Sequence, residues 1–238
     1  MIKKLTSLSR RQLLSLATTA VLPAALPSLA LAQSPRALKV VAPWEVSNLD
    51  PSKTGHVFTR LEIAETLVEV DDQGLLMPGL ARSWTTAPNG LEWRFALRST
   101  ARFHDNTPVT AEAVVACLQR ALAQPGVLRN TGAQQIAAQG GEVVIKLAKP
   151  FSALPAFLAH NSTMILAPAA FAADGSVKQL IGSGPYQVVE VSPPQSLRTR
   201  RFEGFDGLKP LIEAVDYLGA SRGETRGMMA SAGQADLA

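Results

Sequence analysis

The chain of 238 residues contains a single cysteine, and only 5% of its residues are aromatic. One cysteine excludes an intrachain disulfide framework and a zinc module built from several cysteines. A hydrophobic fraction of 47% with a charged fraction of 18% excludes a disordered chain, because this composition supplies enough apolar residues for a buried core. The length allows one large domain or two small ones.

The sequence also lacks the common motifs of catalytic, metal and nucleotide sites. Its three histidines, His56, His104 and His160, have no second ligand at helical spacing, and no HExxH or GxxxxGK[ST] occurs. Residues 182–184 (GSG) lack the outer glycines of a nucleophile elbow and do not extend to GxGxxG. A glycine pair before a strand is typical of backbone geometry. We therefore expect no metal, no cofactor and no enzymatic activity.

The remaining reactive and aromatic side chains are predicted to be structural. Cys117 falls within an apolar helical stretch, where a small buried hydrophobic residue is the ordinary role of cysteine. No His or Asn lies beside it in the sequence to favour a thiolate, which leaves only neighbours in space. We expect Trp44, Trp84 and Trp93 to be packing residues and not a carbohydrate platform.

The net charge of +4 comes entirely from the first residues of the chain. All four charged residues among positions 1–32 are basic, namely Lys3, Lys4, Arg10 and Arg11. The remainder has 23 − 4 = 19 basic residues against 19 acidic ones. A neutral body has no field that attracts phosphate backbones, so we expect no nucleic-acid partner.

Residues 1–32 are predicted to be an export signal. A basic start is followed by an apolar stretch from Leu13 to Leu31 and by small residues at 30–32, which predict cleavage after Ala32. Residues 9–14 (SRRQLL) match the twin-arginine pattern, so the Tat export machinery is the expected transient partner. The alternative, an anchor helix, conflicts with Pro23 and Pro27. No later segment has the roughly 18 apolar residues of a membrane span, and we expect a soluble periplasmic protein.

Hydrophobic periodicity predicts an α/β protein without regular alternation of strands and helices. The residues at 48–51 (NLDP) read as a turn, and Thr110 is placed to cap the helix that follows it. Helices are predicted at 58–70, with an extended conformation as the alternative for 67–70, at 111–123 and, as a short one, at 151–158. Strands are predicted at 37–43, 92–98, 142–147, 186–191, 197–202 and 211–218.

Four separated blocks of sequence occur in an order that resembles a known family. These blocks are residues 65–84 (ETLVEVDDQGLLMPGLARSW), 91–98 (LEWRFALR), 102–114 (RFHDNTPVTAEAV) and 182–186 (GSGPY). Together they resemble the family 5 solute-binding proteins, the extracytoplasmic components of ABC importers for dipeptides, oligopeptides and nickel complexes. The likeness extends from about Leu38 to the end of the chain, although Asn106 and Ala113 replace the usual Gly and Asp.

The resemblance implies a periplasmic-binding-protein type II-like fold, which is α/β with a mixed sheet and an inserted subdomain. Residues 33–50 and 181–238 are then expected to form part of the main lobe, and residues 51–180 the subdomain of the same lobe. Family members continue into a second lobe that supplies half of the ligand cleft. We expect that lobe to be largely missing, so the sequence is either a fragment or a truncated product.

The resemblance also implies where a ligand would bind. It nominates His56, Phe58, Arg129 and Asn161, with a small solute such as a peptide as ligand and ABC permease subunits as partners. Arg129 is a candidate for pairing with a ligand carboxylate, against the alternative of a solvated loop arginine. Nickel binders of the family carry an arginine near Asn161, so the asparagine argues against a nickel complex.

Two other functions remain as alternatives. An exported hydrolase would use His104 with Asp105, but adjacent residues of a strand and turn point apart. A non-binding remnant would expose apolar surface that normally faces a second lobe.

Overall fold

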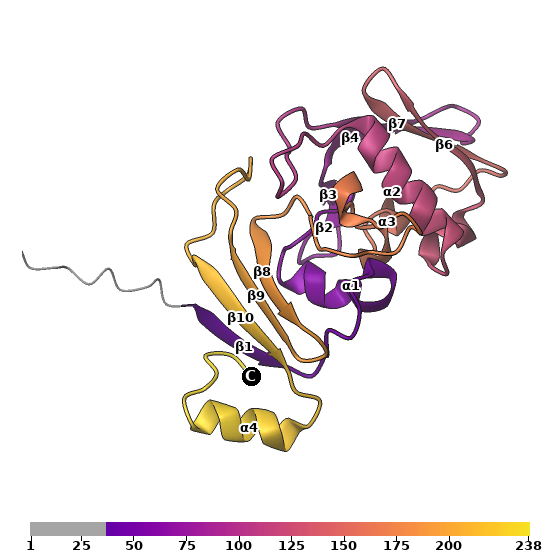
Figure 1. Ribbon diagram of the computed structural model, residues 1–238. Helices are drawn as coiled ribbons and strands as arrows, with labels where there is room; N and C mark the ends of the chain where they lie inside the picture. Colours follow the sequence, from indigo (N-terminus) through magenta and orange to yellow (C-terminus); the bar gives the residue numbers. More distant parts are fainter. Residues whose placement is uncertain (1–36) are drawn as a thin grey trace, which may run out of the picture. The chain divides into compact units, whose positions relative to one another are not determined.

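The computed structural model describes residues 37–238, and the predicted export signal lies outside the described residues. The chain divides into two units, Met1–Ser34 and Pro35–Ala238, and everything below concerns the second. Figure 1 shows its elements coloured along the sequence.

A mixed four-stranded sheet joins the two ends of this unit, as Figure 1 shows. β1 runs parallel to β10, whereas β10, β9 and β8 are antiparallel to their neighbours. Side chains alternate across the sheet: Val215 and Tyr217 are buried, while Arg198 and Lys39 are exposed. One face therefore packs on the core and the other is polar. The strands, in sheet order, are β1 (Leu38–Ala42), β10 (Ala214–Gly219), β9 (Ser196–Arg201) and β8 (Tyr186–Ser192).

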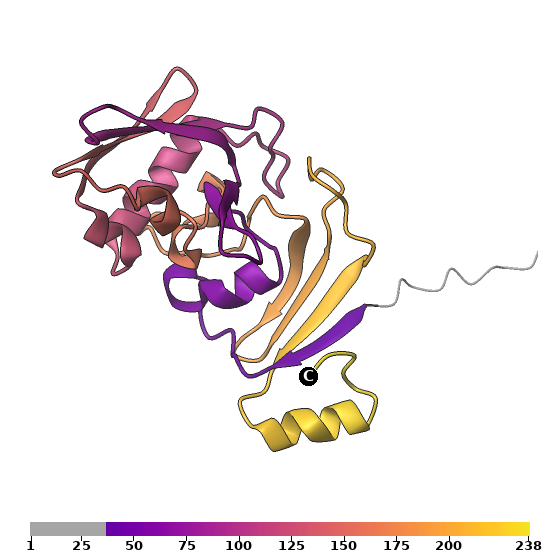
Figure 2. The same cartoon turned by 180° about the vertical axis from the view of Figure 1, so that it is seen from behind.

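A second, antiparallel sheet is built from the middle of the chain, with α2 (Ala111–Ala123) packed against β6 and β7 (Figure 2). Trp93 and Phe95 point from β5 into one continuous cluster of buried side chains, which also contains Val215 and Tyr217 of the first sheet. The core thus links the two sheets. The strands, in sheet order, are β4 (Ala81–Thr86), β5 (Glu92–Leu97), β7 (Glu142–Leu147) and β6 (Ala133–Gln139); a separate hairpin pairs β2 (Val68–Val70) with β3 (Leu76–Pro78).

The first helix, α1 (Pro51–Arg60), corrects the sequence prediction of a helix over 58–70. Asp50 is its N-cap and accepts a hydrogen bond from the Ser52 N–H, with Pro51 in the first helical turn. The segment predicted as a turn is therefore a helix start. An aspartate before proline has the same extended backbone in both structures, so the two patterns look alike in sequence.

The remaining helices are short. The predicted helix over 151–158 forms only α3 (Leu154–Phe157), and α4 (Gly223–Ser231), which no pattern predicted, contains no buried residue. No helix within residues 37–238 combines the length and apolarity needed to cross a bilayer. Three 3₁₀ turns complete the unit: η1 (Val127–Thr131), η2 (Asn161–Thr163) and η3 (Pro168–Ala170).

The strand predictions at 37–43, 92–98, 142–147, 186–191, 197–202 and 211–218 each correspond to an observed strand within a few residues. Helix 111–123 has the predicted bounds, and the Thr110 hydroxyl accepts from the Ala113 N–H at 3.3 Å. The first sheet uses strands from both predicted main-lobe ranges, and the second sheet lies within 51–180. The division into a main lobe and an inserted subdomain stays a prediction.

Candidate functional site

The loops at one end of the first sheet meet where β1 and β10 both finish. The Val46 N–H donates to the Pro194 carbonyl, the Gly219 N–H to that of Gln195, and the Ala220 N–H to that of Ala42. Ligands of open α/β sheets bind outside the carboxyl ends of the strands. This end of the sheet is therefore a candidate binding surface.

Trp44 leaves β1 at this end with its indole partly exposed, at 39%. Its carbonyl accepts a hydrogen bond from the Tyr217 hydroxyl at 2.6 Å, which fixes the backbone under the ring. The backbone of Gly219 passes so close that a Cβ there would lie 2.6 Å from the same carbonyl oxygen. Trp93 is buried and Trp84 half-buried, as expected of packing residues, whereas Trp44 keeps an exposed side.

Two side chains of α1 surround this indole and, with it, form what we call the Trp44 cluster: Trp44, His56 and Arg60. The His56 ring meets the indole edge-on, with centroids 5.8 Å apart, and the Arg60 guanidinium lies 4.3 Å above the indole centroid. Burial, and secondarily the charge of Arg60, lowers the pKa of His56, which favours the neutral imidazole. Its Nε2 is buried and has no hydrogen-bond partner within residues 37–238.

Asn161 lies against the same helix. A Cβ on Gly55 would approach the Asn161 carbonyl oxygen to 2.9 Å, so only glycine lets η2 pack this closely on α1. Because Gly55 precedes His56 directly, the fold places the segments of two predicted ligand residues side by side. Asn161 itself is half-buried.

The other two predicted residues have different surroundings. Phe58 is fully buried in the core, so its side chain supports α1 from within and offers no surface to a solute. Arg129 is exposed in η1 and makes no ion pair or hydrogen bond within the described part of the chain. Its turn begins at Gly126, where a Cβ would lie 3.5 Å from Ser162 Oγ, which places η1 beside η2.

Groups that would favour a catalytic site are instead engaged in structure. His104 Nε2 lies 3.0 Å from the Gly184 carbonyl oxygen, and burial lowers the pKa of His104 to about 4. Asp105 accepts hydrogen bonds from Thr107, not from His104. Burial raises the pKa of the Cys117 thiol to about 11, so it stays protonated at neutral pH. No cluster of potential metal ligands occurs among residues 37–238.

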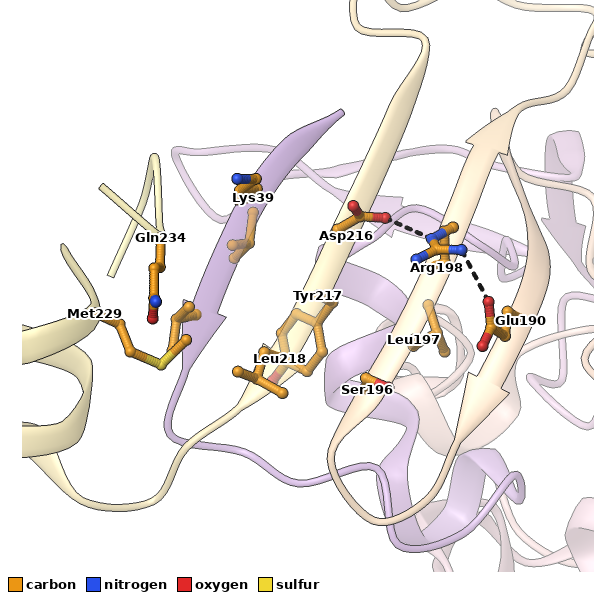
Figure 3. A pocket seen from close by; sticks show the side chains of 12 residues that line it. Lys39, Glu190, Ser196, Leu197, Arg198, Asp216, Tyr217, Leu218, Met229 and Gln234 are labelled. Carbon is orange, nitrogen blue, oxygen red and sulfur yellow. Dashed lines mark hydrogen bonds and ion pairs between the residues drawn. The ribbon is translucent and has the colours of Figure 1, made fainter. Parts of the chain in front are cut away.

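A shallow pocket of about 230 Å³ lies on the polar face of the first sheet, with Met229 and Gln234 at its far side (Figure 3). Arg198 crosses this face and pairs with Asp216 and Glu190, each at 2.9 Å. The charge of Arg198 is therefore neutralised by carboxylates of the same sheet. The volume is below the roughly 300 Å³ at which small-molecule sites begin, so this pocket is a weaker candidate than the Trp44 cluster.

Comparison with known proteins identifies the family of this chain. The sequence profile of bacterial extracellular solute-binding proteins, family 5 Middle, matches residues 76–238. The chain belongs to this family. The resemblance seen in the four sequence blocks is thereby confirmed, and members of the family bind solutes without enzymatic activity.

Curated relatives of this family 5 chain include the glutathione-binding protein GsiB of Escherichia coli O1:K1 / APEC. The two sequences are 30% identical over 184 residues, which are 72% of the chain and 35% of the relative. GsiB of Salmonella typhi is 28% identical over 169 residues, 67% of the chain and 33% of the relative. The chain thus spans about a third of the length of these relatives.

Solved structures confirm the mixed α/β fold over part of their length. A nickel ABC transporter protein from Bacillus halodurans superposes with a TM-score of 0.77 at 25% identity, over 84% of the chain and 42% of that protein. AgaA from A. tumefaciens R10, solved with agropinic acid, gives 0.76 at 27% identity over 84% and 43%. DppA from Helicobacter pylori, solved with the peptide STSA, gives 0.73 at 21% identity over 84% and 46%.

Trp44 and Arg60 are the residues that sequence reasoning missed. Arg60 follows His56 at helical i, i+4 spacing, a signal that was available once α1 was placed correctly. The position of Trp44 had no such signal, because its backbone carbonyl is held by the hydroxyl of Tyr217, which is 173 positions away.

Proposed function

We propose that this chain is the solute-capturing part of an ABC importer for peptides or similarly sized solutes, acting in the periplasm and delivering its ligand to membrane permease subunits. Membership of the family carries the proposal, since the relatives named above bind glutathione, nickel or peptide ligands. In such a mechanism a hinge closes two lobes around the solute, and the closed form is presented to the permease.

The Trp44 cluster with Asn161 and Arg129 is the proposed contact surface of this lobe. An exposed indole with a guanidinium above it offers an apolar face next to a positive charge, and Asn161 adds an amide. The neutral His56 ring packs edge-on against the indole, and its buried Nε2 has no hydrogen-bond partner among residues 37–238. These groups recognise a polar solute by hydrogen bonds and charge, and none of them is arranged for bond cleavage.

Calorimetric titration of the purified chain tests this function. The probes are glutathione, the peptide STSA and a nickel–histidine complex, and we expect the peptides to bind and the nickel complex not to bind, since Asn161 supplies no charge. Arg129→Ala should weaken peptide binding more than tenfold by removing a charged hydrogen-bond donor.

Arg82→Ala is the matched control, because Arg82 is an exposed arginine on β4 that makes no hydrogen bond or ion pair with residues 37–238. It should leave affinity unchanged. Equal affinity of the Arg129 variant and the parent would remove Arg129 from the site. Binding of none of the three probes, or chemical conversion of any of them, would overturn the proposed function itself.

A further inference from the structure

A cavity of about 580 Å³ is bordered by the loop after α1, by β2 and by the loop between β9 and β10. The β9–β10 loop lies where β10 begins, whereas the Trp44 cluster lies where β10 ends. None of the residues of the proposed contact surface lines this cavity. Its volume falls within the roughly 300–1,000 Å³ of small-molecule sites, so it is large enough for a ligand of its own.

Three glutamates line this cavity, which we call the acidic cavity: Glu62, Glu65 and Glu69. Its wall contains one cation, Arg98, whose guanidinium is already paired with Glu65 at 2.8 Å and with Asp206 at 3.2 Å. The carboxylates of Glu62 and Glu69 form no hydrogen bond or ion pair with residues 37–238. The wall therefore has two carboxylates without a counter-ion.

Glu65 supplies a second, independent indication of a missing partner. Its side chain is only 8% exposed, and Oε1 accepts a hydrogen bond from Arg98. Oε2 is buried and has no hydrogen-bond partner among residues 37–238. Buried carboxylate oxygens without a partner are uncommon in folded proteins, because desolvation without a hydrogen bond is costly. The orphaned oxygen favours a donor that a bound molecule brings into the cavity.

The three carboxylates also repel one another. Burial raises the pKa of Glu65 to about 7, and the charge of Glu69 acts in the same direction. Partial burial raises the pKa of Glu69, and the charge of Glu62 adds to this rise, although Arg98 opposes it. A cation in the cavity would relieve this repulsion, so the electrostatics favour a positively charged ligand.

The shape and the apolar part of the wall favour an organic cation. No group of side chains within residues 37–238 is arranged to hold a metal ion, so the glutamates do not converge on a single point. Val70, Phe205 and Leu208 line the same cavity, and Leu208 is 96% exposed. Separated carboxylates with apolar side chains beside them are suited to an elongated ligand whose charges lie at its two ends.

Three other cavities of the unit are less suited to a cation. Each has a lysine or arginine without an ion-pair partner in the described part of the chain. These residues are Lys39 in the pocket of Figure 3, Arg120 in a cavity of about 430 Å³ beside α1 and α2, and Arg200 in one of about 550 Å³ beside β9. An unpaired cation in the wall would repel a cationic ligand.

We propose that the acidic cavity binds a small aliphatic dication of the diamine class, with an ammonium group at each end. One ammonium group contacts Glu65 and Glu69, the other contacts Glu62, and the methylene groups lie along Val70 and Phe205. This site is additional to the contact surface described under the proposed function and does not depend on it.

The test is calorimetric titration of the purified chain with 1,4-diaminobutane. The diamine should bind at least tenfold more tightly than 1-aminobutane, which lacks one charge, and 1,4-butanediol should not bind, because each lost charge removes a charge-assisted hydrogen bond. Glu62→Gln and Glu69→Gln should each weaken the diamine about tenfold. Both residues are exposed, so neither substitution should disturb the fold.

Proton release provides a second readout. At pH 7 about half of the Glu65 side chains are protonated, and a bound cation should drive that proton off, because it stabilises the carboxylate. Titrations in Tris and in phosphate, whose heats of ionisation differ, should therefore give different binding heats. Glu65→Gln should abolish the difference, and equal heats in the parent would overturn the assignment of Glu65 to the site.

The matched controls are Glu112→Gln, an exposed carboxylate outside the cavity, and Arg129→Ala, and both should bind the diamine like the parent. Thermal unfolding of each variant separates lost binding from lost folding. Unchanged affinity in folded Glu62→Gln and Glu69→Gln, an equal loss in Glu112→Gln, or no binding of the diamine at all overturns the inference. The proposed function would stand in each case, because glutathione and STSA are expected at residues that do not line this cavity.

Discussion

At the scale of single residues, two buried titratable groups lie on either side of the segment 182–184. Glu65 is almost fully buried, and this burial raises its pKa to about 7 despite the ion pair with Arg98. His104 donates from Nε2 to the Gly184 carbonyl, because a carbonyl oxygen only accepts, so Nε2 carries the proton. Burial keeps His104 neutral, with a pKa of about 4.

These two groups affect stability in opposite directions over nearly the same pH range. Between pH 4.5 and 7 the folded chain holds a proton on Glu65 that the unfolded chain has released, so stability falls as pH rises. Between pH 6.5 and 4 the unfolded chain takes up a proton that folded His104 excludes, so stability falls as pH falls. The two contributions, each about 3 kcal/mol across its range, largely cancel.

Substitution of either residue should expose the pH dependence of stability that the other one contributes. In urea unfolding, the free energy of Glu65→Gln minus that of the parent should increase by about 3 kcal/mol from pH 4.5 to pH 7, whereas the same difference for His104→Gln should decrease from pH 4 to pH 6.5. Glu112→Gln, an exposed carboxylate of α2, is the control and should show no such trend. Parallel pH profiles for the parent and Glu65→Gln would contradict this account.

At the scale of elements, two glycines allow the chain to enter β8 beside the loop after α1. A Cβ on Gly184 would lie 2.1 Å from the Glu62 carbonyl oxygen, and one on Gly182 would lie 2.2 Å from that of Ile63. Neither glycine has a positive φ. Glycine is needed at both positions because two backbone segments approach closely there, and not because of an unusual turn conformation.

Gly184→Ala should therefore destabilise the chain by about 1 to 3 kcal/mol, because the new methyl group forces two backbone segments apart. Gly227→Ala is a control of opposite sign. Gly227 lies within α4 with open space around it, so alanine there should stabilise that helix by about 0.5 to 1 kcal/mol. Urea unfolding measures both, and an unchanged midpoint for Gly184→Ala would show that the two segments separate freely.

The elements that could be predicted are those whose local signals agree. α2 has a threonine cap, an acidic first turn and an apolar stripe, and its predicted bounds were confirmed. β6 was missed because it is an edge strand in which only Ile136 is buried, so it lacks alternation. α4 was missed because its glycines and its lack of a buried face leave no helical pattern.

For the candidate site, the sequence indicated which segments contribute residues but not how the side chains of those residues are oriented. The resemblance placed His56 and Asn161 on segments that the fold brings together. It could not show that Phe58 points inward, since the neighbours that bury it come from many parts of the chain. Arg120 and Phe171 are 51 positions apart, so no local sequence pattern indicates that the guanidinium stacks on the ring.

At the scale of the whole molecule, the loop between β9 and β10 carries the most exposed large apolar side chains. Leu208 is 96% exposed and Leu211 97% exposed, although Arg201, Glu203 and Lys209 tie the loop down by ion pairs at 2.9 Å. An apolar surface held in a fixed position favours association. Exposed apolar surface is what the alternative of a non-binding remnant expects, and that alternative stays a prediction.

Replacing Leu208 and Leu211 together by serine should reduce binding of a hydrophobic dye and shift any self-association seen by size-exclusion chromatography toward monomer. Unfolding free energy should change by less than about 0.5 kcal/mol, because these side chains bury almost nothing in the chain itself. A large loss of stability in the double variant would mean that the leucines pack against the chain in solution.

The parallel pairing of β1 with β10 has a consequence for how the chain is made. Within residues 37–238, β1 bonds to β10, to Ala220 and to residues 236–237, and the Tyr217 to Trp44 bond closes a separation of 173 positions. At about 5–20 residues per second, a ribosome needs about 9 to 35 seconds to synthesise that interval. The β4–β5–β7–β6 sheet has all its strands by Leu147, so we expect it to assemble before the partner of β1 has been synthesised.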